Sequence, residues 1–214
     1  MTTDKQDYIP ALSFRFLTPY FDAIQSGLVR DIIYKRRLIE QANIQPGHRV
    51  VDLGCGTGTL AIMAKQAQPL AHVSGLDGDP EILGIALKKA ATLGVDVTFD
   101  EGMTFALPYA DGSIDRVLSS IMIHHLKTPD KIRTAKEIYR VLKPGGQLHI
   151  IDFGKPSTLY AKLLGPLLHE FEEANDNIDG LLPEIFGAPG LTMRPMGDFQ
   201  TFFGTLTFLY GQKQ

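Results

Sequence analysis

The feature that most constrains the fold of this chain is the run of residues 50–59, which reads VVDLGCGTGT. Two β-branched valines lead to the carboxylate of Asp52, and an apolar helical stripe begins at Leu60. Between them, every second position is a glycine: Gly54, Gly56 and Gly58. This order predicts a buried strand, a sharp turn and the start of a helix. Because glycine permits a positive φ and has no Cβ, a ligand can approach the backbone of this turn closely.

Two classes of ligand use such a turn. A dinucleotide fold requires the spacing G-x-G-x-x-G with a pyrophosphate over the helix N-terminus, but Thr59 stands where the third glycine belongs. Asp52 would also place a negative charge beside that pyrophosphate, which is unfavourable. A ligand with a positive charge therefore fits the turn better. Cys55, inside the turn, is better explained as a small buried residue than as a nucleophile, because no base is evident near it in the sequence.

Residues 50–59 resemble the first motif of the class I S-adenosylmethionine-dependent methyltransferases, and residues 140–146, RVLKPGG, resemble the segment before their fifth strand. The resemblance is strong over residues 46–155 and weaker at both ends. The most similar group is that of the small ubiquinone- and menaquinone-biosynthesis methyltransferases. This resemblance implies that the chain binds S-adenosylmethionine, transfers its methyl group to a small-molecule acceptor and releases S-adenosylhomocysteine.

Several cofactor-binding residues follow from the same motifs. Asp77 ends the second predicted strand, where an acceptor-only carboxylate can bind both ribose hydroxyls. The family usually carries Gly-Asp-Ala after the third strand, and its Asp reads the adenine amino group. Here Met103 and Thr104 follow the glycine, so their backbone groups are expected to hold the ring. The core of the expected cofactor site is Asp52, Gly54, Cys55, Gly56, Gly58, Asp77, Gly78, Met103, Thr104 and Ser119.

The N-terminal helices supply further candidates. In the family such helices cover the methionine end of the cofactor, and a guanidinium or a phenol binds its carboxylate well. Tyr20, Arg30 and Tyr34 are therefore candidates for this contact. The alternative, which the sequence favours for each of them, is that the tyrosines pack in the core and Arg30 is solvated.

Proton transfer is expected near the ends of the two middle strands. Strand four, at residues 114–118, is soon followed by His124 and His125, and strand five, at residues 148–152, ends in Asp152. A histidine that titrates near neutrality can deprotonate a nucleophile, so His124 and Asp152 are the catalytic candidates and His125 comes after them. For each the alternative is structural: a hydrogen bond to the backbone or the capping of a loop. No spacing resembles a zinc site, so no metal is expected.

Alternating strand and helix patterns predict an α/β fold with a doubly wound, mostly parallel, seven-stranded sheet of the Rossmann-like methyltransferase type. We expect one domain over residues 1–214. Its expected parts are an N-terminal helical cap (1–45), the cofactor-binding core (46–155), a helical insertion (156–190) and a C-terminal antiparallel strand pair (191–214).

Some local expectations are more specific. The third strand is predicted at residues 95–99. Asp79 and Pro80 indicate a helix start, and the segment beginning at Thr128 is expected to cap the next helix, which Pro144-Gly145-Gly146 ends. The acidic residues of the insertion are expected to face solvent, and residues 183–190 are a candidate lid.

Composition narrows the class of protein. A net charge of −3 gives no basic field for nucleic acid. One cysteine excludes an internal disulfide and fits a reducing, cytoplasmic location. The start has no apolar core of a signal peptide, and no apolar run is long enough to span a membrane.

The expected partner is a moderately hydrophobic small molecule, and the chain is expected to be a monomer or a homodimer. The alternatives are an NAD-dependent oxidoreductase and an S-adenosylmethionine-binding protein without turnover.

Overall fold

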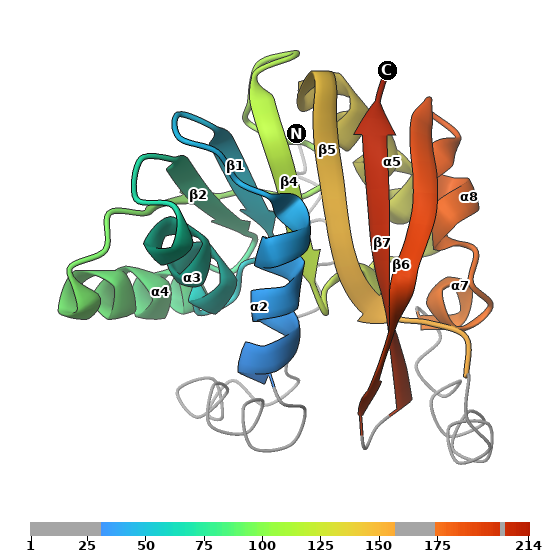
Figure 1. The fold of residues 1–214 in the computed structure, drawn as a ribbon, viewed down its shortest axis with the longest axis horizontal. Coiled ribbons are helices and arrows are strands. Elements are labelled where there is room, and N and C mark those ends of the chain that lie inside the picture. Colours follow the sequence, from blue (N-terminus) through green and yellow to red (C-terminus); the bar gives the residue numbers. More distant parts are fainter. Residues whose placement is uncertain (1–30, 157–173, 202–203) are drawn as a thin grey trace, which may run out of the picture.

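The structure is a computed structural model that describes residues 31–156, 174–201 and 204–214. Tyr20, Arg30, the expected first N-terminal helix and the first part of the expected insertion lie outside the described residues. Within them, seven strands form one sheet in the order β3-β2-β1-β4-β5-β7-β6 (Figure 1). The five strands from β3 to β5 are parallel, and β7 and β6 are added antiparallel. The expected doubly wound, mostly parallel, seven-stranded sheet is confirmed.

The strands are β1 (Arg49–Leu53), β2 (His72–Asp77), β3 (Thr98–Glu101), β4 (Ile114–Ser120), β5 (Leu142–Phe153), β6 (Leu191–Thr201) and β7 (Gly204–Lys213). The helices are α2 (Asp31–Ala42), α3 (Thr59–Ala67), α4 (Pro80–Leu93), the 3-10 turn η2 (Ile123–His125), α5 (Thr128–Val141), α7 (Asn175–Ile178) and α8 (Leu182–Gly187). No helix within these described ranges is long and apolar enough to cross a membrane.

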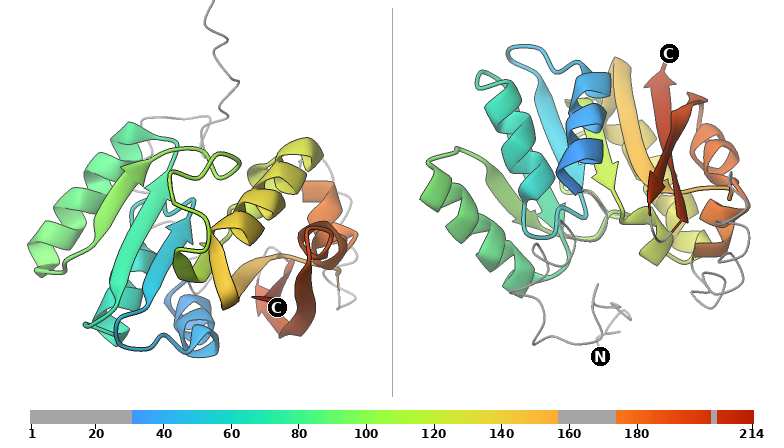
Figure 2. Two further views of the ribbon diagram at one scale, coloured as in Figure 1. Left: turned by 90° about the horizontal axis from the view of Figure 1, so that it is seen from above. Right: turned by 60° about the horizontal axis from the view of Figure 1, so that its bottom comes forward.

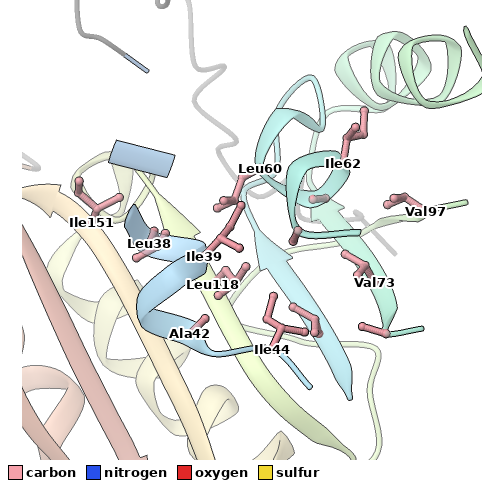
Figure 3. Close-up of a cluster of buried hydrophobic side chains, with 14 of the residues drawn as sticks. Leu38, Ile39, Ala42, Ile44, Leu60, Ile62, Val73, Val97, Leu118 and Ile151 are labelled. Atoms are coloured by element: carbon pink, nitrogen blue, oxygen red, sulfur yellow. The ribbon is translucent and has the colours of Figure 1, made fainter. Parts of the chain in front are cut away.

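Helices cover both faces of the sheet, which is why the central strands are apolar on both sides. Helices α2, α3 and α4 lie on one face, and α5 and α8 lie on the other (Figures 1 and 2). Figure 3 shows the first core, in which Leu38, Ile39 and Ala42 of α2 meet Leu118 of β4 and Ile151 of β5. The second core joins α5 and α8 to the opposite face of the same strands. The carboxyl ends of β1 and β4 thus remain the natural place for a ligand, because the strand order reverses there.

Two strand predictions were wrong in their bounds. The third strand begins at Thr98, not at residue 95, because Gly94 ends α4 in the left-handed region and Val95 still donates its N–H to Ala90. Strand β5 begins at Leu142, so the KPGG segment lies inside the strand and not between helix and strand. Leu142 already pairs with Ile114, and the register shifts before the ladder continues at Arg116.

Three expectations for helices also need correction. Thr128 does not cap α5, since its hydroxyl donates to Asp176 at 2.6 Å. Asp176 does not face solvent, because it also pairs with Lys131, which is fully buried. The candidate lid is not loose: α8 buries Leu182 and Phe186 and packs on α5 and β6. By contrast, the predicted cap at Asp79 is confirmed, since its carboxylate accepts from the N–H groups of Glu81 and Ile82.

Candidate functional site

The glycine turn between β1 and α3 requires its glycines for two reasons. Gly54, Gly56 and Gly58 all have positive φ, at 64°, 53° and 75°. A Cβ on Gly54 would collide with the side chain of Met122, and one on Gly58 would lie 2.7 Å from Phe99. At Gly56 the nearest atom to such a Cβ is 3.8 Å away, in Ile82. The turn therefore packs closely at its two ends and stays open at its middle, where a ligand can approach the backbone.

Asp77, at the end of β2, holds this turn in place. Its Oδ2 accepts the N–H of Gly56 at 2.8 Å, and its Oδ1 accepts the N–H of Asp79 at 3.1 Å. Burial raises the pKa of Asp77, and these two N–H groups oppose the rise because they stabilise the charged form. Since a carboxylate oxygen has two acceptor positions, the contacts leave capacity for further donors.

Asp52, near the end of neighbouring β1, is the least satisfied group of the site. It is 1% exposed, and its Oδ2 has no hydrogen-bond partner. Burial raises the pKa of Asp52 to about 7, against the opposing charge of Lys35 and a hydrogen bond from the Ala61 backbone. A buried carboxylate with a free oxygen is costly to ionise alone. The site therefore fits a ligand that brings a positive charge, such as a sulfonium or an ammonium group.

The remaining predicted cofactor residues use part of their hydrogen-bonding capacity within the fold. The Thr104 hydroxyl is paired with that of Thr134 at 3.0 Å, and the Met103 carbonyl accepts from Ala106. Ser119 is fully buried and its hydroxyl donates to the Leu53 carbonyl at 3.4 Å. Burial raises the pKa of the Cys55 thiol well above its usual range, which fits a small packed residue. Gly78 follows β2 directly and is partly buried.

The two catalytic candidates are in contact. Asp152 Oδ1 accepts from His124 Nδ1 at 2.8 Å, and Asp152 Oδ2 accepts from the N–H groups of Ile123 at 2.7 Å and Met122 at 3.1 Å. Burial favours the neutral form of Asp152, but His124 and the Phe153 N–H outweigh it, so the pKa of Asp152 lies below its usual value. Asp152 thus caps the turn and orients His124 at the same time.

This contact decides which nitrogen of His124 is available. An ionised carboxylate only accepts hydrogen bonds, so Nδ1 carries a proton, and in the neutral ring the lone pair lies on Nε2. The ring lies between those of His125, at 4.0 Å between centroids, and Phe153, at 4.8 Å and 81°. The side chain is 12% exposed, so part of the ring remains reachable. The η2 turn that carries His124 also contacts the glycine turn, because Met122, the residue before η2, packs on Gly54.

Sequence reasoning missed a buried polar cluster on α2. The Tyr34 hydroxyl donates to Asp31 at 2.6 Å, and Lys35 pairs with the same carboxylate at 2.8 Å. All three residues are buried. The spacing i, i+3 and i+4 on one helix was the available signal. The Tyr34 hydroxyl, considered above for the methionine carboxylate, is thus engaged by Asp31, while Lys35 acts on Asp52 through its charge.

Comparison with known proteins identifies the family of this chain. A family model described as a methyltransferase domain matches residues 50–146. A demethylmenaquinone methyltransferase of Thermus thermophilus is 37% identical, over 91% of this chain and 94% of that protein. One from Deinococcus radiodurans is 30% identical, over 96% and 91%.

Solved structures share the fold. An S-adenosylmethionine-dependent methyltransferase of Methanosarcina mazei has a TM-score of 0.66 at 21% identity, covering 82% of this chain and 96% of that one. A phosphoethanolamine N-methyltransferase of Haemonchus contortus, bound to S-adenosylhomocysteine, has a TM-score of 0.68 at 19% identity, covering 84% and 52%. From the site and its relatives together, the chain belongs to the class I S-adenosylmethionine-dependent methyltransferases of the menaquinone and ubiquinone type, and transfers a methyl group from that cofactor to a small-molecule acceptor.

Proposed function

We propose that the acceptor is the reduced, dihydroxy form of a quinone-type ring, and that a ring carbon receives the methyl group. The relatives from Thermus thermophilus and Deinococcus radiodurans are named for the methylation of demethylmenaquinone. The observation that carries the proposal is the pair of His124 and Asp152, joined at 2.8 Å beside the glycine turn. Such a pair can remove a proton from a ring hydroxyl, which makes the ring carbons nucleophilic.

In this mechanism His124 Nε2 takes the proton of an acceptor hydroxyl. Asp152 keeps Nδ1 protonated, holds the ring in place and stabilises the imidazolium that forms. Bound S-adenosylmethionine supplies an electrophilic methyl group, whose bond to sulfur breaks with the electron pair staying on sulfur as the new carbon–carbon bond forms. Loss of the proton from the methylated ring carbon to water restores the aromatic ring, and His124 returns its proton to the ring oxygen.

The chain's other contribution is position. We assign the cofactor to the glycine turn, with Asp52 beside its positive charge and Asp77 at the ribose. Met103 and Thr104 are assigned to the adenine through their backbone N–H groups. Fixing two reactants in line supplies about 7–11 kcal/mol of the barrier reduction. The base adds about 10²–10⁴-fold in rate.

The test uses His124→Gln with a short-chain, demethylated naphthoquinol as acceptor. We expect kcat to fall about 10²–10⁴-fold, while the Kd for S-adenosylmethionine is unchanged, because His124 lies on the acceptor side of the glycine turn. His72→Gln, at the exposed start of β2, is the matched control and keeps wild-type kcat. If His124→Gln keeps the wild-type kcat, His124 is not the base. If the wild-type protein does not methylate the naphthoquinol, the proposed acceptor is wrong.

A further inference from the structure

Asn177 on α7 is a buried amide that the fold itself does not use. The residue is 1% exposed, and neither its Oδ1 nor its Nδ2 has a hydrogen-bond partner. An amide carries one acceptor and two donors, and leaving them buried and unpaired destabilises the fold. A native protein retains such a cost only for a reason, such as a bound ligand or water.

The location of Asn177 favours a bound ligand over a buried water as the explanation. Within the described ranges, buried side-chain atoms without a partner occur in Asp52, Ser120 and Asn177. Asp52 and Ser120 stand at the carboxyl ends of β1 and β4. Helix α7 packs on η2 and β5 and lies at the same edge of the sheet (Figure 1). All three residues thus lie toward the carboxyl edge of the parallel strands, and α7 touches the segment that carries His124.

Helix α7 is fixed in this place by the residue before Asn177. Asp176 accepts hydrogen bonds from Thr128 at 2.6 Å and from Lys131 at 3.1 Å, both on the first turn of α5. That turn of α5 follows η2, which carries His124. Two polar contacts of Asp176 therefore hold α7 against the segment that follows His124, and Asn177 is the next residue of that helix.

We propose that Asn177 binds an oxygen of the acceptor and sets the enzyme's requirement for it. This inference rests on the proposed function: one ring oxygen of the quinol faces His124, and the oxygen across the ring meets the Asn177 amide. Nδ2 donates to that oxygen, and Oδ1 accepts the proton of its hydroxyl. The acceptor class is therefore a ring with two oxygens in para positions. Rings with a single hydroxyl bind less well because the amide then stays unpaired.

The experiment compares Asn177→Leu, which keeps the branched shape of the side chain and removes its polar atoms, with Asp179→Ala at the exposed position directly after the same helix. The probe is a short-chain, demethylated 1,4-naphthoquinol. We expect its KM to rise about 10-fold or more in Asn177→Leu, from the loss of one or two hydrogen bonds. The Kd for S-adenosylmethionine and all constants of Asp179→Ala stay at wild-type values. The melting temperature without acceptor stays the same or rises, because an unpaired polar group has left the core.

A second measurement excludes an indirect effect. The inhibition constants of the two monohydroxy analogues, each lacking one of the para oxygens, are measured for wild type and variant. For the analogue that lacks the oxygen at Asn177, the inhibition constant should be the same in wild type and in Asn177→Leu. For the naphthoquinol, the KM should differ between the two proteins. If Asn177→Leu does not fold, Asn177→Asp, which replaces the donor by an acceptor, gives the same expectation for KM.

An unchanged KM in a folded Asn177 variant would overturn the inference and point to a buried water only. An equal loss of affinity for the naphthoquinol and for both analogues would also overturn the inference, because such a uniform loss indicates a structural role of Asn177. If the wild type methylates the naphthoquinol normally, these results concern Asn177 alone. If the wild type neither binds nor methylates it, the proposed acceptor and the role of Asn177 fail together.

Discussion

The charge of Asp52 depends on what lies beside its free oxygen. In the protein alone, burial raises the pKa of this carboxyl to about 7, so near neutrality it is only partly ionised. A cationic ligand at Oδ2 stabilises the charged form and lowers the pKa again. Binding of the cofactor is therefore linked to the release of a proton from Asp52.

This linkage predicts that S-adenosylmethionine binds more weakly as the pH falls below 7. The Kd is expected to rise by up to about tenfold per pH unit between pH 7 and pH 5. Calorimetric titration in buffers of different ionisation enthalpy measures both the Kd and the protons released. Asp52→Asn should bind weakly at every pH and release no proton, whereas Asp96→Asn, at an exposed position, should behave as wild type. Proton release that persists in Asp52→Asn would assign the linkage to another group.

The sequence allowed Asp52, Asp77, His124 and Asp152 to be selected because each follows or ends a strand that is recognisable by its apolar pattern. The carboxyl ends of parallel strands meet at one edge, so position along the chain was enough. Asn177 carries no such signal. Its significance comes from the burial of both polar atoms, which depends on how α7 packs and which no residue pattern encodes.

At the scale of elements, two of the ion pairs that α5 makes differ in burial. Lys131, fully buried, pairs with Asp176 of α7 at 3.1 Å, and Arg133, about half exposed, pairs with Asp130 at 3.1 Å on the same helix. The lengths are equal, so the pairs separate the effect of burial from that of distance. Breaking a buried pair leaves a charge in the core, whereas water replaces the partner of an exposed one.

We expect Asp176→Asn to lower the free energy of unfolding by about 2–4 kcal/mol. Asp130→Asn should change it by no more than about 0.5 kcal/mol. Urea unfolding followed by circular dichroism measures both. Combining Asp176→Asn with Lys131→Met should recover most of the loss, because the buried charge is then removed as well. Equal effects of the two single variants would show that α7 contributes little to the stability of the fold.

The order and type of the elements could be predicted from the sequence, and several of their ends could not. The bounds of α4 follow from the local signals Asp79, Pro80 and Gly94. The start of β5 depends instead on pairing between Leu142 and Ile114, residues far apart in the sequence. The hydroxyl of Thr128 likewise has two possible partners, its own helix and Asp176, and only the packing of α7 decides between them.

At the scale of the whole molecule, the pH dependence of stability is set by buried groups that oppose each other. His149 of β5 is fully buried, and its Nδ1 accepts a hydrogen bond from Gln41 of α2 at 3.0 Å. Burial and the nearby Arg116 lower the pKa of His149 to about 3, so the folded protein keeps it neutral. Desolvation also lowers the pKa of His48 and His125. Between pH 6.5 and the folded pKa, the unfolded chain binds more protons at these histidines, so their contribution to stability is lost as the pH falls.

Asp52 acts in the opposite direction over part of this range. Its pKa is about 7 in the folded protein, whereas the ordinary value for an aspartate, taken for the unfolded chain, is 3.8. Between these values the folded protein binds more protons, so stability falls as the pH rises. Each group contributes a slope of up to about 1.4 kcal/mol per pH unit. Because the slopes have opposite signs, Asp52 offsets part of the histidine effect between pH 5 and 6.5, and measurement of the wild type by itself reports only the sum of the two effects.

Single variants separate the two effects. We expect the free energy of unfolding of Asp52→Asn to fall more steeply than that of wild type as the pH is lowered from 6.5 to 5, since the opposing carboxyl is gone. The free energy of unfolding of His149→Gln should fall less than that of wild type over the same pH range, because the unfolded chain no longer gains a proton at residue 149. His72→Gln, at an exposed position, should follow the wild-type curve. Urea unfolding at several pH values measures all four proteins, and parallel curves would mean that neither buried group changes its proton affinity on folding.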